Sequence, residues 1–526
     1  MSAVVSFPTK TDEIISYNPA TGEEIGRAAN TSAEEVKEAV ENARQCFQTW
    51  RETSFRERAK FIMKAREVIL AEMDEIARLI SDESGKPVVE AFSMEIAPVL
   101  DLMQYFAHNA QKILKPEKID IGQLKLLGRS SKIIYQPLGV IAIISPWNYP
   151  FSIPLGEVVM ALMAGNTVVL KPSELTALVG VKIGEIFAKA NLPENVLQVL
   201  TGDGKTGAAL VDSAPNKIMF TGSVATGKKI AAEAAKNLTP VVLELGGKDP
   251  MIVFADADLA AASSAAIWGA FCNSGQSCSS VERLYVEESI KEEFTNLIVE
   301  KTKKLTQNPG CEATSDVGAM ISENQLKIVE NHVADFQKDG AKILTGGKRN
   351  TDFKGTFFEP TVISDAKNKM RGMREETFGP TLPIAAFKTE AEAIELANDT
   401  DFGLTASVWT KDLRKGKRVA EKILAGTVCV NEVLYTHGIG QTPWGGFKQS
   451  GYGRTHGKWG LMELVAPQHI HVNRFTVLPN AWWFGYSENA LATFRGFARH
   501  FASGSLFQTM KLSPQMLKRI KELRKK

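Results

Sequence analysis

A cysteine in a short polar stretch is the first candidate for chemistry in this sequence. Cys278 ends Gly275-Gln-Ser-Cys278 and precedes two serines, so no bulky side chain adjoins its sulfur. Because the thiolate is the nucleophile, a catalytic cysteine needs backbone N–H groups or a neighbouring base that lowers its pKa. Free cysteines are also common in protein cores. This stretch alone therefore leaves a catalytic and a structural interpretation open.

Three further polar groups follow apolar runs that we expect to be strands. Asn148, in Ser145-Pro-Trp-Asn-Tyr-Pro150, has an amide that can donate to an oxyanion, or it is an ordinary turn residue. Lys171 and Glu174 can hold the hydroxyls of a ribose, or they form an exposed ion pair at a helix start. Glu244 is a general base or a solvent-facing strand end.

A strand-to-helix turn at residues 220–228 can bring backbone N–H groups to a pyrophosphate. Its sequence, Phe-Thr-Gly-Ser-Val-Ala-Thr-Gly-Lys, is neither the G-x-G-x-x-G fingerprint nor a P-loop. The turn alone therefore identifies no nucleotide.

The elements that must position these groups alternate between strand and helix. Short apolar runs separated by helical segments occur at residues 140–144, 167–170, 196–200, 217–220 and 241–244. This alternation predicts a parallel α/β sheet with ligands at the carboxyl ends of its strands. A similar pattern from Asp249 to about Val433 predicts a second α/β domain.

Long helical patterns precede these strands. Ser32 and Glu35 form a capping box before the first helix. Two more helices are expected, from Phe55 to about Ser81 and from Val88 to about Leu114, on either side of Gly85-Lys-Pro87. Residues 119–135 predict an exposed hairpin suited to pairing with another subunit.

The amino-acid composition limits which classes of protein this chain can belong to. At 526 residues and 44% hydrophobic, the chain has apolar material for two or three domains. Its five cysteines, Cys46, Cys272, Cys278, Cys311 and Cys429, lack C-x-x-C spacing, so no disulfide framework or metal site is indicated. The N-terminus lacks a signal-peptide pattern, and the uncharged run 133–156 carries four prolines, which argues against a membrane span. We therefore expect a cytoplasmic protein.

Taken together, these stretches resemble the aldehyde dehydrogenase superfamily over about residues 15–472. The motifs that carry the resemblance are Glu83-Ser-Gly-Lys-Pro87, Pro146-Trp-Asn148, Lys171-Pro-Ser-Glu174, Phe220-Thr-Gly-Ser223, Glu244-Leu-Gly-Gly-Lys248, Gly275-Gln-Ser-Cys278, Glu376-Thr-Phe-Gly-Pro380, Asn398-Asp-Thr-Asp-Phe-Gly-Leu404 and Pro443-Trp-Gly-Gly-Phe-Lys-Gln-Ser-Gly451.

The resemblance implies a role for each matching residue. Cys278 would be the nucleophile, Glu244 the base that activates water, and Asn148 a donor of the oxyanion hole. The cofactor, NAD with NADP as the alternative, would be held by Trp147, Lys171, Glu174, Gly202, Gly222, Ser223, Leu245, Gln325, Glu376 and Phe378. Cys272 lacks the Gly-Gln approach and is expected to be structural.

The same resemblance implies an α/β fold with several parts. We expect a Rossmann-like NAD-binding domain (1–118 and 136–247), a catalytic α/β domain (248–440) and an oligomerisation β-flap (119–135 and 465–475). A homodimer or homotetramer is expected, without nucleic acid as a partner.

Residues 476–526 extend beyond the usual end of the family. They hold nine Lys/Arg and two Asp/Glu, whereas the remainder holds 53 and 58. Leu491, Phe494, Phe497, Ala498 and Phe501 form one apolar helical face, and Ser513-Pro514 predicts the start of a second helix in which Met516, Ile520 and Leu523 lie opposite Lys518, Arg519 and the other basic residues. A basic amphipathic extension indicates peripheral membrane contact or a packed helix with a solvated face.

The substrate is inferred from residues expected near the entry tunnel. Tyr149, Ile153, Gly156 and Trp444 suggest a wide apolar channel. A hydrophobic aldehyde, long-chain aliphatic or terpenoid/carotenoid, is therefore expected, with a small semialdehyde as the alternative. A CoA-acylating enzyme and a catalytically silent relative are disfavoured because Cys278, Asn148 and Glu244 are all present.

Overall fold

The computed structural model describes residues 13–309, 313–477, 479–503 and 506–525. The first twelve residues, Cys311 and Lys526 lie outside these ranges. The chain forms two compact units: residues 13–114 with Gln136–Ala466, and Lys115–Tyr135 with residues 467–525. The first unit holds both large sheets. The expected borders of the NAD-binding and catalytic domains, at residues 247 and 440, therefore stay predictions.

A six-stranded sheet in the first unit has the order β17-β9-β8-β5-β6-β7. All five apolar runs predicted as strands form it, and they pair in parallel. Only the short β17 is antiparallel. The strands are β5 (Val140–Ile144), β6 (Thr167–Lys171), β7 (Leu197–Val199), β8 (Lys217–Thr221), β9 (Val241–Glu244) and β17 (Gly451–Tyr452).

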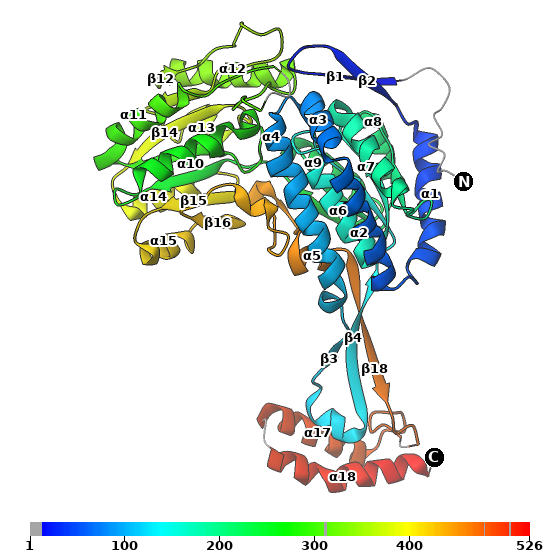
Figure 1. Ribbon diagram of the computed structural model, residues 1–526. Coiled ribbons are helices and arrows are strands. Elements are labelled where there is room, and N and C mark those ends of the chain that lie inside the picture. Colours follow the sequence, from blue (N-terminus) through cyan, green and yellow to red (C-terminus); the bar gives the residue numbers. More distant parts are fainter. Residues whose placement is uncertain (1–12, 310–312, 478, 504–505, 526) are drawn as a thin grey trace. The chain divides into compact units, whose positions relative to one another are not determined.

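Helices cover this sheet (Figure 1). Val36, Val40 and Ala43 of α1 share a core with alternate residues of β5, and α6 packs on β5 and β6 and is buried throughout. Burial on both faces explains why the strands read as continuous apolar runs. The helices are α1 (Ala33–Trp50), α6 (Ser152–Ala164), α7 (Ala177–Lys189), α8 (Gly204–Asp212) and α9 (Val224–Ala235), and the capping box of Ser32 and Glu35 begins α1 as predicted.

The expected long helix from Phe55 to Ser81 is two helices, α2 (Phe55–Ala71) and α3 (Met73–Ser84). Glu72 between them has φ −112° and ψ 14°, outside the helical region, which a pattern of apolar residues does not reveal. The next segment is α4 (Val88–Glu90), a π-helix η1 (Ala91–Ile96) and α5 (Ala97–Ile113). Gly85 ends α3 with a left-handed φ of 77°, which glycine tolerates.

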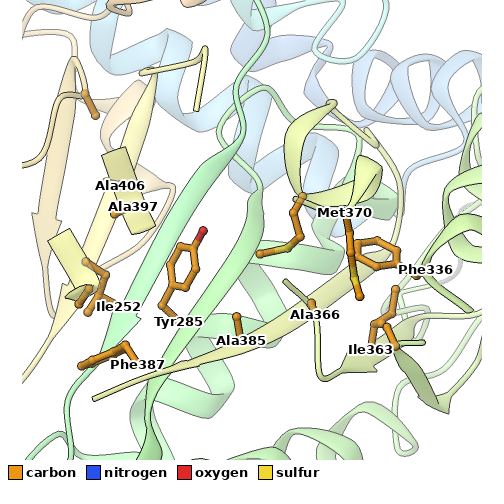
Figure 2. Close-up of a cluster of buried hydrophobic side chains, with 14 of the residues drawn as sticks. Ile252, Tyr285, Phe336, Ile363, Ala366, Met370, Ala385, Phe387, Ala397 and Ala406 are labelled. Carbon is orange, nitrogen blue, oxygen red and sulfur yellow. The ribbon is translucent and has the colours of Figure 1, made fainter. Parts of the chain in front are cut away.

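The second large sheet of the first unit has seven strands in the order β12-β13-β14-β11-β10-β15-β16. Figure 2 shows part of its core, in which Tyr285, Phe336 and Phe387 pack among smaller apolar side chains. The strands are β10 (Asp249–Val253), β11 (Val281–Glu287), β12 (Lys342–Thr345), β13 (Thr361–Ser364), β14 (Thr381–Phe387), β15 (Thr405–Trp409) and β16 (Thr427–Val430). The helices are α10 (Leu259–Phe271), α11 (Lys291–Thr302), α12 (Glu323–Lys338), α13 (Arg371–Arg374), α14 (Glu390–Asn398) and α15 (Leu413–Ala420).

Smaller elements complete the first unit. A two-stranded sheet joins β1 (Glu13–Tyr17) to β2 (Glu24–Ala29). The short helices are η3 (Glu174–Thr176), η4 (Cys272–Gly275), η5 (Glu288–Ile290), η6 (Tyr435–Gly438), η7 (Lys448–Ser450) and α16 (Gly457–Met462).

The second unit is a three-stranded sheet with two helices. Its strands, in the order β18-β4-β3, are β18 (Val465–Asn473), β4 (Arg129–Pro137) and β3 (Glu117–Ile119). A 3-10 helix η2 (Gly122–Leu127) joins β3 to β4, and α17 (Glu488–Ser503) packs against α18 (Leu506–Arg524) (Figure 1). Within the described ranges, none of the helices combines the length and hydropathy needed to cross a membrane.

Two expectations for the extension are wrong. Ser513-Pro514 does not start a helix, because Pro514 lies inside α18; a proline costs a helix one hydrogen bond but does not always end it. Arg519 is not on a solvated basic face, because it is fully buried.

Candidate active site

Four neighbouring parallel strands bring the predicted polar groups to one edge of the six-stranded sheet. β6, β5, β8 and β9 lie side by side, so their carboxyl ends adjoin. Asn148 lies in the turn after β5, Lys171 ends β6, Ser223 follows β8, and Glu244 ends β9. The predicted strand-end site therefore exists as a geometric feature.

Cys278 and Glu244 line one cavity of about 370 Å³, measured with its open mouth. Cys278 lies in the turn between η4 and β11, and its carbonyl oxygen is so near Gly247 that a Cβ there would approach it to 2.2 Å. The remaining lining residues are Ile153, Glu157, Thr221, Leu245, Leu404, His437, Trp444, Thr455 and His456. The structure thus brings the predicted nucleophile, in the turn before β11, to the predicted base at the end of β9, although these two strands belong to different sheets.

The Cys278 thiol has a raised pKa. Burial is the main cause, and the negative charges of Asp249, Glu376 and Glu244 add to it. The expected lowering of this pKa is therefore absent from this arrangement, because a thiolate here would face carboxylates without a compensating cation. A base must take the thiol proton when the sulfur attacks.

Glu244 is buried at 4% exposure, which excludes the alternative of a solvent-facing strand end. Within the described chain neither of its carboxylate oxygens has a hydrogen-bond partner. Burial raises the pKa of Glu244 well above its ordinary value, the charge of Glu157 raises it further, and Arg454 partly opposes both. A desolvated carboxyl of raised pKa is suited to accept a proton near neutral pH.

Asn148 is held beside the cysteine loop. Its Nδ2 donates to the carbonyl oxygen of Gln276 at 3.1 Å, two residues before Cys278. Its own carbonyl oxygen accepts hydrogen bonds from Lys86 Nζ at 2.7 Å and from Asn273 Nδ2 at 2.9 Å. The backbone and the side chain of Asn148 are thus each held by hydrogen bonds.

A second cluster gathers Trp147, Gln325, Glu376 and Phe378. The Trp147 and Phe378 rings meet edge to face at a centroid distance of 5.3 Å. Gln325 Nε2 donates to the carbonyl oxygens of Thr377 and Phe378, at 3.0 and 3.1 Å. Gln325 therefore holds the turn that presents Glu376 and Phe378.

Glu376 lies against the backbone after β9. Gly247 N–H donates to its carboxylate at 3.1 Å, and a Cβ on Gly246 would come within 2.4 Å of the same group. Only glycine leaves this space free. Burial, followed by the charge of Glu282, raises the pKa of Glu376 to about 8.

The other predicted cofactor residues lie at strand ends, apart from this cluster. Lys171 Nζ contacts Glu174 Oε2 at 3.2 Å, which matches the expected pair. Ser223 caps α9, and Gly222 N–H donates to the Glu244 carbonyl oxygen at 3.0 Å. Gly202 lies in the loop after β7, while the side chain of Leu245 lines the Cys278 cavity.

Sequence reasoning missed several cavity residues, of which Glu157 is the most important. Burial raises its pKa to about 8, and its Oε2 has no hydrogen-bond partner among the described residues. A signal existed, since Glu157 is the only charged residue in α6. His437 and His456 also line the cavity, and burial lowers both of their pKa values, that of His437 to about 4.

Two of the four residues expected near the entry tunnel line this cavity. Ile153 and Trp444 line the cavity, but Tyr149 and Gly156 do not. The Tyr149 ring instead lies under Lys86 Nζ, 4.4 Å from its centroid, and Gly156 faces Leu102. Burial is the main cause of the raised pKa of Tyr149, and Cys272 and Cys278 add to it, so Tyr149 still lies close to the cysteine loop.

Residues 7–470 match the model of the aldehyde dehydrogenase family. The chain belongs to the aldehyde dehydrogenase family. A 4,4'-diapolycopene aldehyde oxidase from Methylomonas sp is 40% identical over 510 residues, which cover 97% of this chain and 95% of that protein. A betaine aldehyde dehydrogenase from Bacillus subtilis is 39% identical over 474 residues, 89% of this chain and 95% of that protein.

A solved structure agrees with this membership. Betaine aldehyde dehydrogenase from Staphylococcus aureus, crystallised with NAD+, has a TM-score of 0.85 and 35% identity, and the match covers 90% of this chain and 94% of that one. The α/β fold of this aldehyde dehydrogenase is therefore the predicted one.

Proposed function

We propose that this aldehyde dehydrogenase oxidises a hydrophobic aldehyde, long-chain aliphatic or terpenoid/carotenoid, to the carboxylic acid with NAD. The observation that carries the proposal is the cavity shared by the Cys278 thiol and the unpartnered Glu244 carboxylate. A half-buried thiol beside a buried base is an arrangement that suits acyl-enzyme chemistry.

The residues present fit a dinucleotide. The capped N-terminus of α9 and the small Gly222 suit a pyrophosphate, and the carboxylate of Glu174 suits an adenosine ribose. Glu376, Phe378 and Trp147 would hold the nicotinamide end. NADP is the less favoured alternative, because Glu174 would repel a 2′-phosphate.

In the first half-reaction Cys278 Sγ bonds to the aldehyde carbon and its proton passes to a base. The developing oxyanion accepts hydrogen bonds from Asn148 Nδ2 and the Cys278 backbone N–H. Such donors contribute roughly 3–4 kcal/mol each to transition-state stabilisation. Bound NAD supplies the hydride acceptor that converts this adduct into a thioester.

In the second half-reaction Glu244 takes a proton from water, whose oxygen bonds to the thioester carbon. The carbon–sulfur bond breaks, the acid is released, and Cys278 is protonated again. Glu244 suits this step because its oxygens are free of other hydrogen bonds within the described structure. This hydrolytic use of Glu244 disfavours acyl transfer to CoA.

The cavity wall supports a hydrophobic substrate. Ile153, Leu404 and Trp444 contribute apolar surface, and no Lys or Arg is among the described residues that line it. A semialdehyde would therefore find no cation for its carboxylate. The relative named for diapolycopene aldehyde matches 97% of this chain, so its match includes most of residues 476–526, whereas the Bacillus betaine relative matches 89%.

The proposal extends to the surroundings of the enzyme. We place it in the cytoplasm as a homodimer or homotetramer that pairs through the β-flap, without nucleic acid. Residues 476–526 would contact a membrane peripherally, where a hydrophobic aldehyde accumulates.

The test is product analysis with matched cysteine variants. The full chain should convert a long-chain aldehyde to free acid with stoichiometric NADH and no CoA, and more efficiently (kcat/KM) than succinic semialdehyde or betaine aldehyde. Cys278→Ala should abolish turnover, while Cys272→Ala, at a buried position six residues earlier, should not. Residual turnover well above background in Cys278→Ala would refute the assigned nucleophile.

A further inference from the structure

A short aromatic loop precedes α17, and one buried arginine holds it in shape. The Arg519 guanidinium of α18 donates to the carbonyl oxygens of Ala481, Trp483 and Gly485, at 3.1, 2.7 and 2.7 Å. Gly485 has φ +96°, which permits the turn. Arg519 also contacts Glu522 Oε2 at 3.3 Å, so its charge is balanced. The backbone of the loop is therefore fixed before any partner arrives.

The side chains of this fixed loop are exposed. Trp482 and Trp483 are 49% and 50% exposed, and Phe484 and Tyr486 are 86% and 67% exposed. Leaving large aromatic rings in water is unfavourable, and a contiguous patch of this kind marks a contact surface. Rigid presentation lowers the entropy lost when such a surface binds.

Helix α17 adds apolar side chains to the exposed surface of this unit. It buries Ala490, Thr493 and His500, whereas Leu491 and Phe501 remain 44% and 78% exposed. The apolar residues predicted as one face are thus not all used in packing the unit. Leu517 of α18 is also exposed.

Basic side chains accompany the aromatic ones. Arg495 and Arg499 of α17, and Lys518, Lys521 and Arg524 of α18, are exposed. Residues 476–526 carry nine Lys/Arg and two Asp/Glu. Such a charge favours an anionic surface, at which each Lys or Arg adds to the attraction.

We propose that the loop 482–486, with the exposed basic residues of α17 and α18, is a docking surface for an anionic lipid bilayer. Trp and Tyr, which have an apolar ring and a polar atom, suit the headgroup region, and Phe484 suits the acyl boundary. This inference rests on the proposed function, because a bilayer is where a hydrophobic aldehyde would be found. A second copy of the chain is the competing occupant, but each copy would bring the excess of nine Lys/Arg over two Asp/Glu in residues 476–526 to the contact, and like charges repel.

The test is co-sedimentation of the full chain with vesicles of phosphatidylcholine alone or mixed with phosphatidylglycerol. Binding should require phosphatidylglycerol and weaken at high salt, because the electrostatic part is screened. Trp483→Ala/Phe484→Ala should bind at least about tenfold more weakly, since it leaves the carbonyl groups that Arg519 contacts in place. Lys518→Glu/Lys521→Glu should lose the preference for phosphatidylglycerol.

Matched controls come from the other unit. Trp459→Ala/Leu238→Ala removes side chains that are 54% and 90% exposed, and Lys303→Glu/Lys304→Glu reverses two exposed charges. Both should bind vesicles like the parent. Equal vesicle binding by Trp483→Ala/Phe484→Ala and by its control would overturn the proposal. A change in the oligomer mass of the loop variant without a change in its vesicle binding would also overturn it.

Activity on hexanal without vesicles separates the two proposals. If the loop variant loses vesicle binding but oxidises hexanal at the parent rate, the docking surface is supported and the proposed function is unaffected. If the parent binds vesicles but does not oxidise hexanal, the proposed function fails and the docking surface stands.

Discussion

Two carboxyl groups, Glu157 and Glu244, share the cavity that holds the Cys278 thiol. Charged groups face them from several elements: Arg454 and Glu463 act on Glu244, while His437 and His456 are held neutral by burial. Two buried carboxylates cannot both ionise easily in one cavity. At neutral pH at least one of them therefore holds a proton.

This buried carboxyl makes stability depend on pH. Burial raises the folded pKa of Glu157 to about 8 from its ordinary value of 4.5, so between these values the folded chain holds a proton that the unfolded chain has lost. Stability therefore falls as pH rises through this window. Glu157→Gln should remove this pH-dependent part of the free energy of unfolding, which is on the order of a few kcal/mol at most. The Tm of Glu157→Gln minus the Tm of the parent should therefore increase from about pH 5 to about pH 9.

Scanning calorimetry across this pH range provides the measurement. Glu292→Gln, at an exposed position of α11, is the control and should follow the parent at every pH. A Tm difference for Glu157→Gln that stays constant with pH would contradict the expected ionisation.

At the scale of elements, a buried ion pair lies beneath the turn that carries Asn148. Lys86 Nζ contacts Glu95 Oε1 at 2.5 Å and the Asn148 carbonyl oxygen at 2.7 Å. Glu95 Oε2 accepts the backbone N–H groups of Phe151 and Ser152, at 2.8 and 3.1 Å. The π-helix η1 places Glu95 there, and π-helical turns are frequent at functional sites. Lys86 is thus a positioning residue for Asn148.

We predict that Lys86→Met lowers kcat by about 10- to 100-fold with a smaller change in KM, because displaced donors impair the transition state. In an Asn148→Ala background the same change should cost almost nothing more, since Lys86 acts through Asn148. Lys86→Arg should restore part of the rate.

Lys182→Met is the matched control in the same double-mutant cycle. Lys182 is similarly buried and contacts Glu75 and Glu72, away from Asn148. Its effect should be equal in both backgrounds. An equal cost of Lys86→Met with and without Asn148 would mean that Lys86 only stabilises the fold.

At the scale of the whole molecule, β18 forms one edge of the three-stranded sheet. Six of its nine residues are exposed, and Val472 is 44% exposed. A long edge strand with open backbone groups tends to pair with another chain. We therefore expect the full chain to associate through this edge.

Light scattering should give a dimer or tetramer for the parent. Val472→Glu should weaken self-association at least about tenfold, because a charge would be buried at the interface. Val477→Glu, at a position that is 83% exposed and outside the strand, is the control. A monomeric parent would contradict the expectation.

Local patterns in the sequence determined the elements and the candidate residues. Continuous apolar runs predicted β5, β6, β8 and β9 within one or two residues, because a strand buried on both faces needs apolar side chains throughout. The capping box of Ser32 and Glu35 predicted the start of α1 because its hydrogen bonds are local. The motifs around Cys278, Glu244 and Asn148 indicated the family, which the comparisons confirm.

Only the tertiary structure decided which distant groups meet and which charges are hidden. Lys86 reaches the carbonyl of Asn148, Glu157 enters the cavity of Cys278, and Arg519 turns inward to the loop at 481–485. Each result depends on packing between segments far apart in the chain. Sequence periodicity describes one element at a time and cannot specify such contacts. The raised pKa of Cys278 has the same origin, because burial and neighbouring carboxylates exist only in the folded chain.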